Sequence, residues 1–538
     1  MADLLPIEVP SNYLRSRNRD HTGSLYPISD DLRFDYGTAG FRMVANLLPF
    51  AVFRIGYVAG LRSRVLNKCI GIMITASHNP EIDNGVKIVD PMGEMLSSDW
   101  EKIATELVNA KDDQLPTTIR ALEVQMAPLR SASNASVVCA MDTRISSPHL
   151  VEAARAGAEL FNVHFRNHGL LTTPQLHYIV RCRNDPEFGE ASEVGYYKCL
   201  STAFNELLSL TPGEKSKLRV DCANGIGAPK FKELMTYLNE SLDIEYANTK
   251  GELNHNCGAD FVKISQTLPV GFEECLVNEK CASFDGDADR LVYFKRKSND
   301  ENNVSLLDGD KIAVLLTKYI KEQLDVAGLN DDLSLGIIQT AYANGASSQY
   351  IKDALGINAV FVPTGVKHLH HAAIKFDIGI YFEANGHGTV VFSSKFDNLV
   401  RKSEKSNDGV RRLALISRVI NEVVGDAMAD LLAVEIILRH YGWTVENWQE
   451  QLYKDFPNVQ IKVPVVDRSI YKTTWDETTL IEPPGLQEKI NELIAKYPKA
   501  RSFVRPSGTE CLVRVYAEAE TSEDTTALGA AIADLVRA

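Results

Sequence analysis

Short apolar runs rich in β-branched residues recur along the chain, and each is followed by a polar segment. The run Ile70–Ile74 predicts a buried strand, which ends in Thr-Ala-Ser-His-Asn-Pro at residues 75–80. Because Pro80 disfavours the helical region for the residue before it, the chain should leave this strand in an extended or turned conformation. We therefore expect Ser77 at the rim of a sheet, where open α/β sheets bind ligands.

A second strand should run back beside the first. Asn84-Gly85 is a hairpin signal, so Val86–Val89 is expected to pair antiparallel with Ile70–Ile74. This pairing would bring Lys87 close to the Ser77 loop.

The same patterns recur further along the chain. Strand–loop–strand units are expected again at residues 280–294 and 378–392, and strand–turn–helix units at residues 136–160, 218–238 and 335–355. In the unit at residues 136–160, the segment 142–148 is expected to cap the helix His149–Leu160. The C-terminal part instead predicts strands Gln460–Val466 and Cys511–Glu518 with helices Gly485–Lys496 and Glu523–Val536. The predicted fold class is α/β, with three related α/β domains of mixed sheets plus a small α+β C-terminal domain.

Composition sets the broad class of the protein. A chain of 538 residues is too long for one core, and 45% apolar with 24% charged residues is ordinary for a globular protein. No apolar run approaches the roughly 18 residues of a membrane-spanning helix, and the first ten residues lack the pattern of a signal peptide. The nine cysteines are scattered without a Cys-x-x-Cys pair, which favours reduced thiols in a cytoplasmic protein.

The net charge of −14 argues against nucleic acid and anionic membranes as partners. A phosphorylated substrate would therefore need cations gathered locally, because the overall field repels anions. The loop Gly-Thr-Ala-Gly-Phe-Arg at residues 37–42 supplies one of them. Its two glycines let the backbone approach a ligand closely, and Arg42 offers a fork of donors.

Residues 285–290 read Asp-Gly-Asp-Ala-Asp-Arg and form the most specific motif. Carboxylates at every second position of an extended segment project to one side. Two such charges about 4 Å apart repel by roughly 4 kcal/mol at an effective dielectric near 20, so the group needs a cation, and Mg²⁺ suits an all-oxygen set. An EF-hand is excluded because its loop needs a glycine where this chain has Arg290. Asp289 does not fit a haloacid-dehalogenase-like motif. An acidic surface turn is the remaining alternative. The candidate metal ligands are Asp285, Asp287 and Asp289.

The segment 504–510 is expected to be a loop, in which Arg-Pro-Ser-Gly-Thr at residues 505–509 combines a guanidinium, two hydroxyls and a flexible glycine. A phosphate could accept hydrogen bonds from Arg505, Ser507, Gly508 and Thr509, with Arg514 on the following strand adding a second guanidinium. The alternative is a plain Pro-Ser-Gly β-turn.

Two further polar loops suit the hydroxyls of a sugar. Residues 383–388 offer a carboxylate, an amide and an imidazole from Glu383, Asn385 and His387. Upstream, residues 363–368 form a polar turn that contributes Gly365, Lys367 and His368. The adjacent histidines, His370 and His371, are expected to be structural residues of a helix.

One mechanism uses all of these groups. Ser77 would carry a phosphoryl group as phosphoserine, and Mg²⁺ on the three aspartates would take an oxygen of that phosphate. Arg42 and Lys87 would neutralise the remaining charge while the other loops hold a sugar phosphate. The general base is left open among Lys87, His78 and Lys367, with Lys87 preferred.

Four separated motifs, at residues 37–42, 75–80, 285–290 and 505–510, together resemble the α-D-phosphohexomutase superfamily. The resemblance spans nearly the whole chain and implies four domains around a central active-site cleft. They would be a phosphoserine domain, a metal-binding domain, a sugar-binding domain and a phosphate-binding domain, at residues 1–178, 179–297, 298–450 and 451–538. It also implies a phosphoserine at Ser77, which joins the three aspartates as a ligand of Mg²⁺, and a hexose 1,6-bisphosphate as intermediate and activator.

One departure from the superfamily pattern is informative. In most members the strand ending in Asp-x-Arg precedes the Ser-His-Asn-Pro loop, whereas here Asp142-Thr143-Arg144 follows it. This order, and the Glu-Ala-Asn-Gly-His-Gly loop at residues 383–388, resemble the branch that acts on N-acetylglucosamine phosphates. The resemblance implies reversible conversion of N-acetylglucosamine 6-phosphate to the 1-phosphate, for the biosynthesis of UDP-N-acetylglucosamine.

Other functions stay open at this point. A glucose or mannose phosphomutase of the same fold is one alternative, and a sugar-phosphate phosphatase that hydrolyses phospho-Ser77 is another. A non-catalytic sugar-phosphate sensor is disfavoured because every catalytic residue type is present, and a Ser77–His78 acyl transferase lacks a third triad member. The expected partner is a small-molecule sugar phosphate, with no nucleic acid and no membrane, and the oligomeric state is not predicted.

Overall fold

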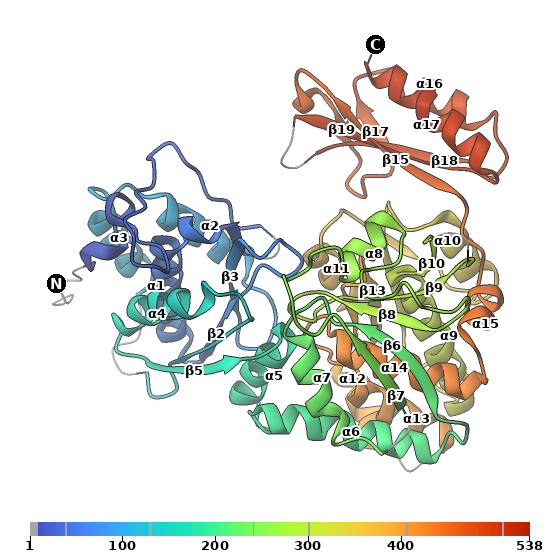
Figure 1. Cartoon of the computed structure of the whole chain (residues 1–538), viewed down its shortest axis with the longest axis horizontal. Coiled ribbons are helices and arrows are strands. Elements are labelled where there is room, and N and C mark those ends of the chain that lie inside the picture. Colours follow the sequence, from blue (N-terminus) through green and yellow to red (C-terminus); the bar gives the residue numbers. More distant parts are fainter. Residues whose placement is uncertain are drawn as a thin grey trace. The chain divides into compact units, whose positions relative to one another are not determined.

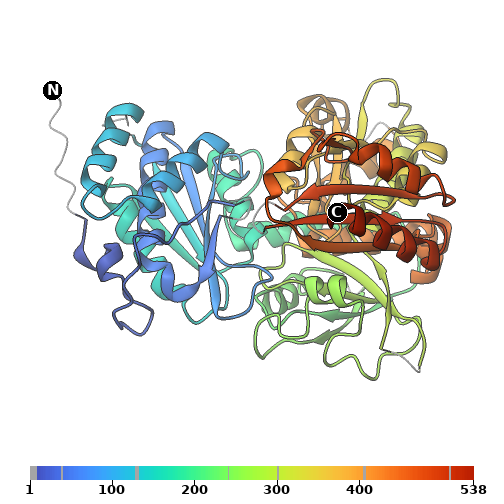
Figure 2. The same ribbon diagram turned by 90° about the horizontal axis from the view of Figure 1, so that it is seen from above.

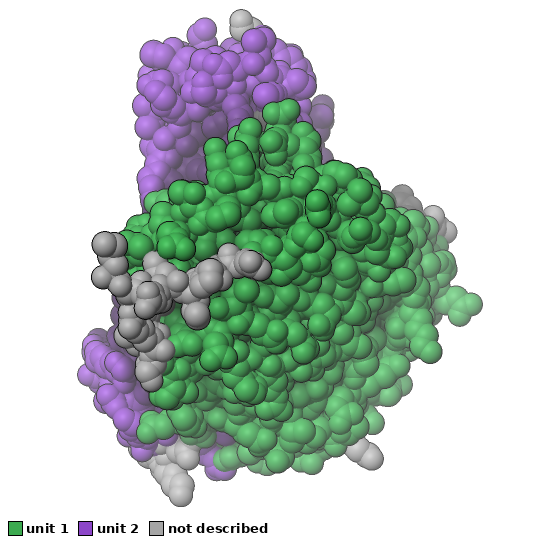
Figure 3. Space-filling view, turned by 90° about the vertical axis from the view of Figure 1, so that its left-hand side faces the viewer, with its two compact units in different colours: residues 1–210, 214–306, 418–432 green, residues 211–213, 307–417, 433–538 purple. Residues whose placement is uncertain are grey.

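The computed structural model, whose course is drawn in Figure 1, describes residues 9–37, 40–127, 132–239, 242–299, 302–403, 407–507 and 511–537. The chain forms two compact units, coloured separately in Figure 3. Unit 1 comprises residues 1–210, 214–306 and 418–432, and unit 2 comprises residues 211–213, 307–417 and 433–538. The described residues form five sheets with helices packed on them, so the predicted α/β class is confirmed. The predicted domain boundaries at residues 178, 297 and 450 stay predictions.

The first sheet, in unit 1, has the strand order β1-β3-β2-β4-β5. Its strands are β1 (Phe41–Val44), β2 (Cys69–Ile74), β3 (Asp83–Val89), β4 (Ser136–Met141) and β5 (His164–Leu170). Strand β3 runs antiparallel to β2 with Val86 opposite Ile74, so the predicted hairpin is confirmed. The predicted position of its turn is wrong, because Asn84 and Gly85 lie inside β3. The side chain of Asn84 is buried and donates to the hydroxyl oxygens of Ser146 and Ser147 at 2.8 and 3.0 Å.

Helices cover both faces of this sheet (Figure 2). The isoleucines of β2 pack in one core with α1 (Pro49–Leu66) and α4 (Ser147–Glu159). Gly71 faces the other way, where Val180 of α5 (Thr173–Asn184) would lie 2.7 Å from a Cβ at this position. Successive strand residues point to opposite faces, so α5 lies on the face away from α1 and α4. Two further helices complete this part, α2 (Ser98–Asn109) and α3 (Leu115–Met126).

The second and third sheets repeat the arrangement of the first. The second, in unit 1, has the order β10-β9-β8-β6-β7, and the third, in unit 2, has the order β12-β11-β13-β14. Their strands are β6 (Ser216–Asp221), β7 (Leu242–Ala247), β8 (Cys281–Phe284), β9 (Leu291–Arg296), β10 (Val304–Leu307), β11 (Leu335–Thr340), β12 (Val360–Val362), β13 (Ile378–Phe382) and β14 (Gly388–Phe392).

Each of the three sheets contains an antiparallel hairpin. The inner strand of the hairpin pairs with a parallel neighbour, and that neighbour pairs with a second parallel strand at the edge of the sheet. The inner hairpin strands are β2, β8 and β13. In the first sheet the hairpin precedes its parallel partner β4, whereas in the other two it follows β6 and β11. The predicted repeat and the reordered first domain are therefore both confirmed.

The helices of these later parts surround the sheets. They are α6 (Glu193–Ser209), α7 (Gly227–Met235), α8 (Ala259–Ser265), α9 (Gly309–Ala327), α10 (Gly345–Asp353), α11 (Val366–Ala373), α12 (Ser394–Phe396), α13 (Asp408–Val419), α14 (Ala427–Tyr441) and α15 (Val445–Gln451). Within the described ranges, no helix has the length and apolar character needed to cross a bilayer.

The C-terminal part of unit 2 is a three-stranded antiparallel sheet of order β15-β19-β18 with two helices on it (Figure 1). Its elements are β15 (Asn458–Pro464), α16 (Leu486–Ile494), β18 (Arg501–Pro506), β19 (Leu512–Glu518) and α17 (Ser522–Arg537), beside a small ribbon of β16 (Lys472–Thr473) and β17 (Leu480–Glu482). The prediction that residues 504–506 belong to a loop is wrong. They pair with β19, and Phe503 and Val504 are both buried.

Candidate active site

Ser77 lies just beyond the end of β2 in a constrained backbone conformation. It is fully buried and has a positive φ of 51°, which is uncommon for a residue other than glycine. Its N–H donates to Thr75 Oγ1 at 2.9 Å, and its carbonyl oxygen accepts from Arg144 at 3.3 Å and from Asn254 at 2.9 Å. Backbone strain that is fixed by so many contacts is typical of functional positions.

Residues 142–144 brace the Ser77 loop. Asp142, which directly follows β4, accepts from Thr75 Oγ1 at 2.8 Å and from the Arg144 guanidinium. That guanidinium also donates to the carbonyl oxygen of Asn79 at 2.7 Å. The N-cap residue of α4, Ser146, lies within the segment 142–148 predicted to cap this helix, but its side chain accepts no capping hydrogen bond.

The three predicted metal ligands meet Ser77. The loop between β8 and β9 carries Asp285, Asp287 and Asp289, all buried, with one oxygen of each within 4.8 Å of the others. Ser77 Oγ donates to Asp285 Oδ2 at 2.5 Å. Gly286 permits this approach, because a Cβ there would lie 2.6 Å from the carbonyl oxygen of Ser77. A buried serine hydroxyl thus lies against three carboxylates.

The aspartate group fits a divalent cation. Burial and the charges of its two neighbours raise the pKa of Asp285 well above its usual value. Asp287 Oδ2 accepts from Thr173 Oγ1 at 2.6 Å, while its Oδ1 is buried and accepts no hydrogen bond from the described residues. An all-oxygen donor set with a buried, unsatisfied carboxylate oxygen is suited to Mg²⁺.

Cations surround these carboxylates. Lys87 Nζ lies 3.5 Å from Asp289 Oδ2 and 3.7 Å from Asp287 Oδ2. Burial and the nearby Arg290 lower the pKa of Arg42, an effect that the three carboxylates oppose. The Nε of Arg42 is buried and donates to no described residue. Of its predicted glycine-rich loop, residues 38 and 39 lie outside the described part of the chain.

His78 also lies beside the serine. Its Nδ1 is 3.5 Å from Ser77 Oγ, and its Nε2 is 3.8 Å from Asp260 Oδ2. Burial, with a further contribution from the charge of Arg290, lowers the pKa of His78 to about 4. The imidazole is therefore neutral at pH 7, but so low a pKa makes it a weak proton acceptor there. The structure brings two of the three candidate bases, Lys87 and His78, to this group.

The predicted phosphate cradle lies in unit 2. Arg505, on β18, donates from NH1 to Thr364 Oγ1 at 2.6 Å, and the same NH1 lies 3.2 Å from Glu477 Oε2. Ser507 is buried, and its carbonyl oxygen accepts from Arg468 NH1 at 2.6 Å. Gly508 and Thr509 lie outside the described residues.

A row of cations crosses the C-terminal sheet at this point. Arg514 lies directly opposite Arg505 on one side and opposite Lys462 on the other. Directly opposite residues share one face of a sheet, so the three cationic side chains are gathered on the same face. This row extends the predicted cradle by Lys462, which no sequence motif marks because its place depends on strand register.

The predicted sugar-binding loop joins β13 to β14 and is held by its own hydrogen bonds. Asn385 Nδ2 donates to Glu383 Oε2 at 3.2 Å, and Asn385 Oδ1 accepts from the backbone N–H of His387 at 2.9 Å. Gly365 is the N-cap of α11, which carries Lys367 and His368. The three hairpin loops, at Ser77, at the aspartates and at Glu383, thus occupy corresponding positions after β2, β8 and β13.

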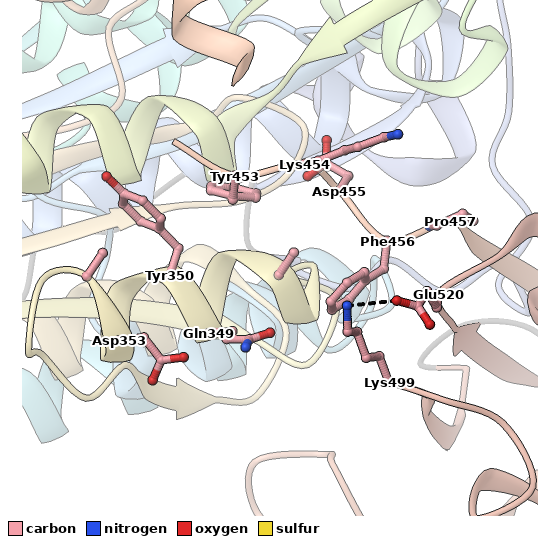
Figure 4. Close-up of a pocket in the computed structure, with 12 residues that line it drawn as sticks. Gln349, Tyr350, Asp353, Tyr453, Lys454, Asp455, Phe456, Pro457, Lys499 and Glu520 are labelled. Carbon is pink, nitrogen blue, oxygen red and sulfur yellow. Dashed lines mark ion pairs between the residues drawn. The ribbon is translucent and has the colours of Figure 1, made fainter. Parts of the chain in front are cut away.

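Unit 2 also contains a cavity of about 620 Å³ between α10 and the segment 453–457 (Figure 4). Tyr350 and Phe456 are among its aromatic residues, and an ion pair of 2.8 Å between Lys499 and Glu520 lies at one side. None of the predicted site residues is among those that line it.

Several residues of the site carry no motif. Thr173 contacts Asp287, Asn254 contacts the Ser77 loop, and Arg290 pairs with Asp260 at 2.6 Å. Arg290 is the exception, because it is the last residue of the Asp-Gly-Asp-Ala-Asp-Arg motif at residues 285–290. The other three are single polar residues, far from the motifs in sequence.

Comparison with known families matches most of the chain. Models described as phosphoacetylglucosamine mutase AMG1, domain II and domain III, match residues 188–292 and 308–443. Models of phosphoglucomutase/phosphomannomutase match residues 58–115 (alpha/beta/alpha domain I) and 461–535 (C-terminal domain).

Curated relatives and solved structures agree with these models. Phosphoacetylglucosamine mutase of Sus scrofa is 47% identical over 510 residues, 93% of each chain, and that of Candida albicans is 44% identical over 538 residues, 95% of this chain and 98% of its own. Aspergillus fumigatus N-acetylphosphoglucosamine mutase in complex with GlcNAc-6P and magnesium is 44% identical, with a TM-score of 0.88 over 95% of this chain and 96% of its own. A variant of that enzyme with a serine replaced by alanine, in complex with glucose 1,6-bisphosphate, has a TM-score of 0.87 over the same shares at 44% identity.

Proposed function

The chain belongs to the phosphoacetylglucosamine mutase family, and from this premise we propose that it interconverts N-acetylglucosamine 6-phosphate and N-acetylglucosamine 1-phosphate. The reaction is an isomerisation by two phosphoryl transfers through a phosphoserine and a 1,6-bisphosphate. It would supply the 1-phosphate for the biosynthesis of UDP-N-acetylglucosamine.

One observation carries the proposal: the hydroxyl of buried Ser77 lies 2.5 Å from Asp285 within a group of three buried carboxylates and adjacent cations. A phosphoryl group on Ser77 carries between one and two negative charges at pH 7, which the carboxylates alone would repel. Mg²⁺ bound by Asp285, Asp287 and Asp289 would supply positive charge to the transferring phosphoryl group. Lys87 and Arg42 contribute further positive charge from this chain.

In the first transfer, the C1 hydroxyl of N-acetylglucosamine 6-phosphate attacks the phosphorus on Ser77. The bond from phosphorus to the sugar oxygen forms as the bond to Ser77 Oγ breaks. The hydroxyl proton passes to a base, for which His78 and the unprotonated form of Lys87 are the candidates in unit 1, and Ser77 Oγ takes up a proton in return. The product is the 1,6-bisphosphate.

In the second transfer the bisphosphate presents its 6-phosphoryl group. Ser77 Oγ loses its proton and attacks this phosphorus, and the C6 oxygen leaves with a proton. Ser77 is phosphorylated again, and N-acetylglucosamine 1-phosphate is released. Arg42 stabilises the same charge in both transfers, because the phosphoryl group is transferred at the same serine each time, and Lys87 does so too where His78 is the base.

Residues of unit 2 suit the rest of the substrate. Arg505, Ser507 and Arg514 would hold the phosphate that is not being transferred, and the register that gathers Arg505, Arg514 and Lys462 on one face of the sheet supports this role. The sugar hydroxyls would be bound by Glu383, Asn385, His387, Gly365, Lys367 and His368, with Gly508 and Thr509 added to the cradle.

We place the reaction in the cytoplasm. The nine cysteines all lie within the described residues and form no disulfide, and one of them, Cys511, is exposed, which suits a reducing compartment.

The proposal is tested by assaying N-acetylglucosamine, glucose and mannose 6-phosphates side by side with wild-type protein and with Ser77→Ala. We expect a strong preference for the N-acetylated sugar and loss of turnover in the variant. A preference for glucose or mannose phosphate would favour a phosphomutase of that specificity. Release of inorganic phosphate at the turnover rate would favour a phosphatase, and full mutase activity in Ser77→Ala would refute the phosphoserine mechanism.

A further inference from the structure

A strained glutamate lies in the turn between β16 and β17. Glu477 has a positive φ of 61°, where glycine or asparagine is normally found. Two backbone hydrogen bonds close the turn. The N–H of Glu477 donates to the carbonyl oxygen of Thr474 at 3.0 Å, and the N–H of Thr474 donates to the carbonyl oxygen of Thr479 at 2.8 Å. Both of these hydrogen bonds join backbone atoms, so closing the turn does not involve the Glu477 carboxylate.

That side chain reaches the phosphate cradle. Glu477 Oε2 accepts the backbone N–H of Thr364 at 3.0 Å and its hydroxyl at 2.7 Å, and lies 3.2 Å from Arg505 NH1. The side chains of Glu477 and Arg505 are only 19% and 15% exposed, so this ion pair is largely removed from water. A desolvated, charge-assisted contact constrains geometry more strongly than a surface pair does.

The contacts with Glu477 and Thr364 lie at the NH1 end of the guanidinium. Arg505 NH1 also donates to Thr364 Oγ1 at 2.6 Å, so the NH1 end is fully engaged. The Nε is buried and donates to no described residue. Nε and NH2 form a parallel pair of donors, the edge with which arginine binds two phosphate oxygens at once.

We propose that Glu477 is a positioning residue of the phosphate cradle, which clamps the NH1 end of Arg505 against Thr364 and presents the Nε–NH2 edge to the non-transferring phosphate. The inference rests on the proposed function for the identity of this phosphate. Thr364 directly precedes Gly365, the N-cap of the helix that carries Lys367 and His368. The Glu477 carboxylate therefore links the phosphate cradle to the start of the predicted sugar-binding helix.

Glu477→Gly separates this role from a structural one. Glycine adopts a positive φ without strain, so the variant should unfold at the same or a higher temperature than wild type. Because the clamp is lost, we expect KM for N-acetylglucosamine 6-phosphate to rise about tenfold or more, with a smaller change in kcat. Inhibition by inorganic phosphate should weaken by a similar factor.

Two further variants sharpen the test. Glu477→Gln keeps the length and an acceptor oxygen but loses the charge, so its KM should lie between those of wild type and Glu477→Gly. The matched control is Glu482→Gln, from the same ribbon, whose carboxylate forms an exposed pair with Lys472 at 3.0 Å. It should leave KM and phosphate inhibition unchanged.

A double-mutant cycle with Arg505→Lys gives the decisive readout. If Glu477 acts through Arg505, adding Glu477→Gln to Arg505→Lys should cost little more phosphate affinity than Arg505→Lys alone. Losses of phosphate affinity that add in the double variant would overturn the inference. So would phosphate inhibition of Glu477→Gly within twofold of wild type, or tighter phosphate binding by Glu477→Gln. Calorimetric titration with inorganic phosphate gives the same comparison without turnover, so it tests the clamp even if the wild-type protein proves inactive on N-acetylglucosamine 6-phosphate.

Discussion

Replacing Lys87 by methionine should change magnesium binding and turnover in opposite directions. Lys87 Nζ lies 3.5 and 3.7 Å from carboxylate oxygens of Asp289 and Asp287, and its side chain is only 12% exposed. At an effective dielectric near 20, each of these attractions amounts to about 4–5 kcal/mol before desolvation and relaxation are counted. Methionine keeps the apolar stem of the side chain and removes the charge.

Loss of this charge leaves the aspartate group more negative and removes a cation that would repel the metal. We expect the affinity of metal-stripped protein for Mg²⁺ to rise at least tenfold, which is about 1.4 kcal/mol and a fraction of the gross attraction. Turnover should fall by roughly 10²–10⁴, the usual range when a group that transfers protons is lost. Isothermal titration with Mg²⁺ and a mutase assay at saturating Mg²⁺ measure the two effects on the same preparations.

Lys87→Arg serves as the matched control, because arginine keeps the charge but does not give up its proton. Its Mg²⁺ affinity should stay near that of wild type while turnover falls, if Lys87 transfers a proton. Weaker or unchanged Mg²⁺ binding in Lys87→Met would refute the electrostatic reasoning. Wild-type turnover in Lys87→Arg would show that the base is another group.

Three further changes test other contacts. Gly286→Ala should lower turnover by roughly 10²-fold, because its Cβ would meet the carbonyl oxygen of Ser77 at 2.6 Å and push the aspartate loop away from the serine by up to about 1 Å. Thr173→Val should weaken Mg²⁺ binding by roughly 10–100-fold in a calorimetric titration, with little change in turnover at saturating metal, because Asp287 loses its 2.6 Å hydrogen bond. Burial raises the folded-state pKa of Asp426 to about 6, above its unfolded value, so its contribution to stability is present below pH 4 and is lost as pH rises through 6. Denaturant unfolding at pH 4 and pH 7 should therefore show wild type losing about 3 kcal/mol relative to Asp426→Asn.

The hairpins and the loops that follow them could be predicted because their signal is local. A short, mainly apolar run followed by a polar loop marks the strands β2, β8 and β13, although β8 (Cys-Ala-Ser-Phe) has no β-branched residue. Because the same strand–loop–strand unit occurs three times, the position of the loop in one unit predicts the position of the corresponding loop in the other two. The position of the first turn could not be predicted, because Asn84 has a turn-like sequence but uses its amide to bind two serine hydroxyls.

Other elements carry no clear periodicity. Helix α1 is buried around most of its circumference, so it lacks the polar face that identifies a helix in sequence. Strand β18 ends in Pro506, and the turn signal of the following residues conceals the strand that carries Arg505. Both elements depend on tertiary packing that a local pattern does not contain.

The same limit applies to the site. Ser77 and the three aspartates were predicted from motifs, and the structure places them together in unit 1. Asn254 and Thr173 contact these residues over sequence separations of 177 and 114, and each is a single polar residue without a motif. Only the fold shows that they belong to the site.

The central claim is that Ser77 carries the phosphoryl group between substrate and product. Intact-protein mass spectrometry followed by peptide mapping, on protein incubated with the 1,6-bisphosphate, tests it directly. We predict a mass increase of one phosphoryl group located on Ser77, which disappears when N-acetylglucosamine 6-phosphate is added in excess with Mg²⁺. Turnover by a protein whose Ser77 peptide is never phosphorylated would contradict the account.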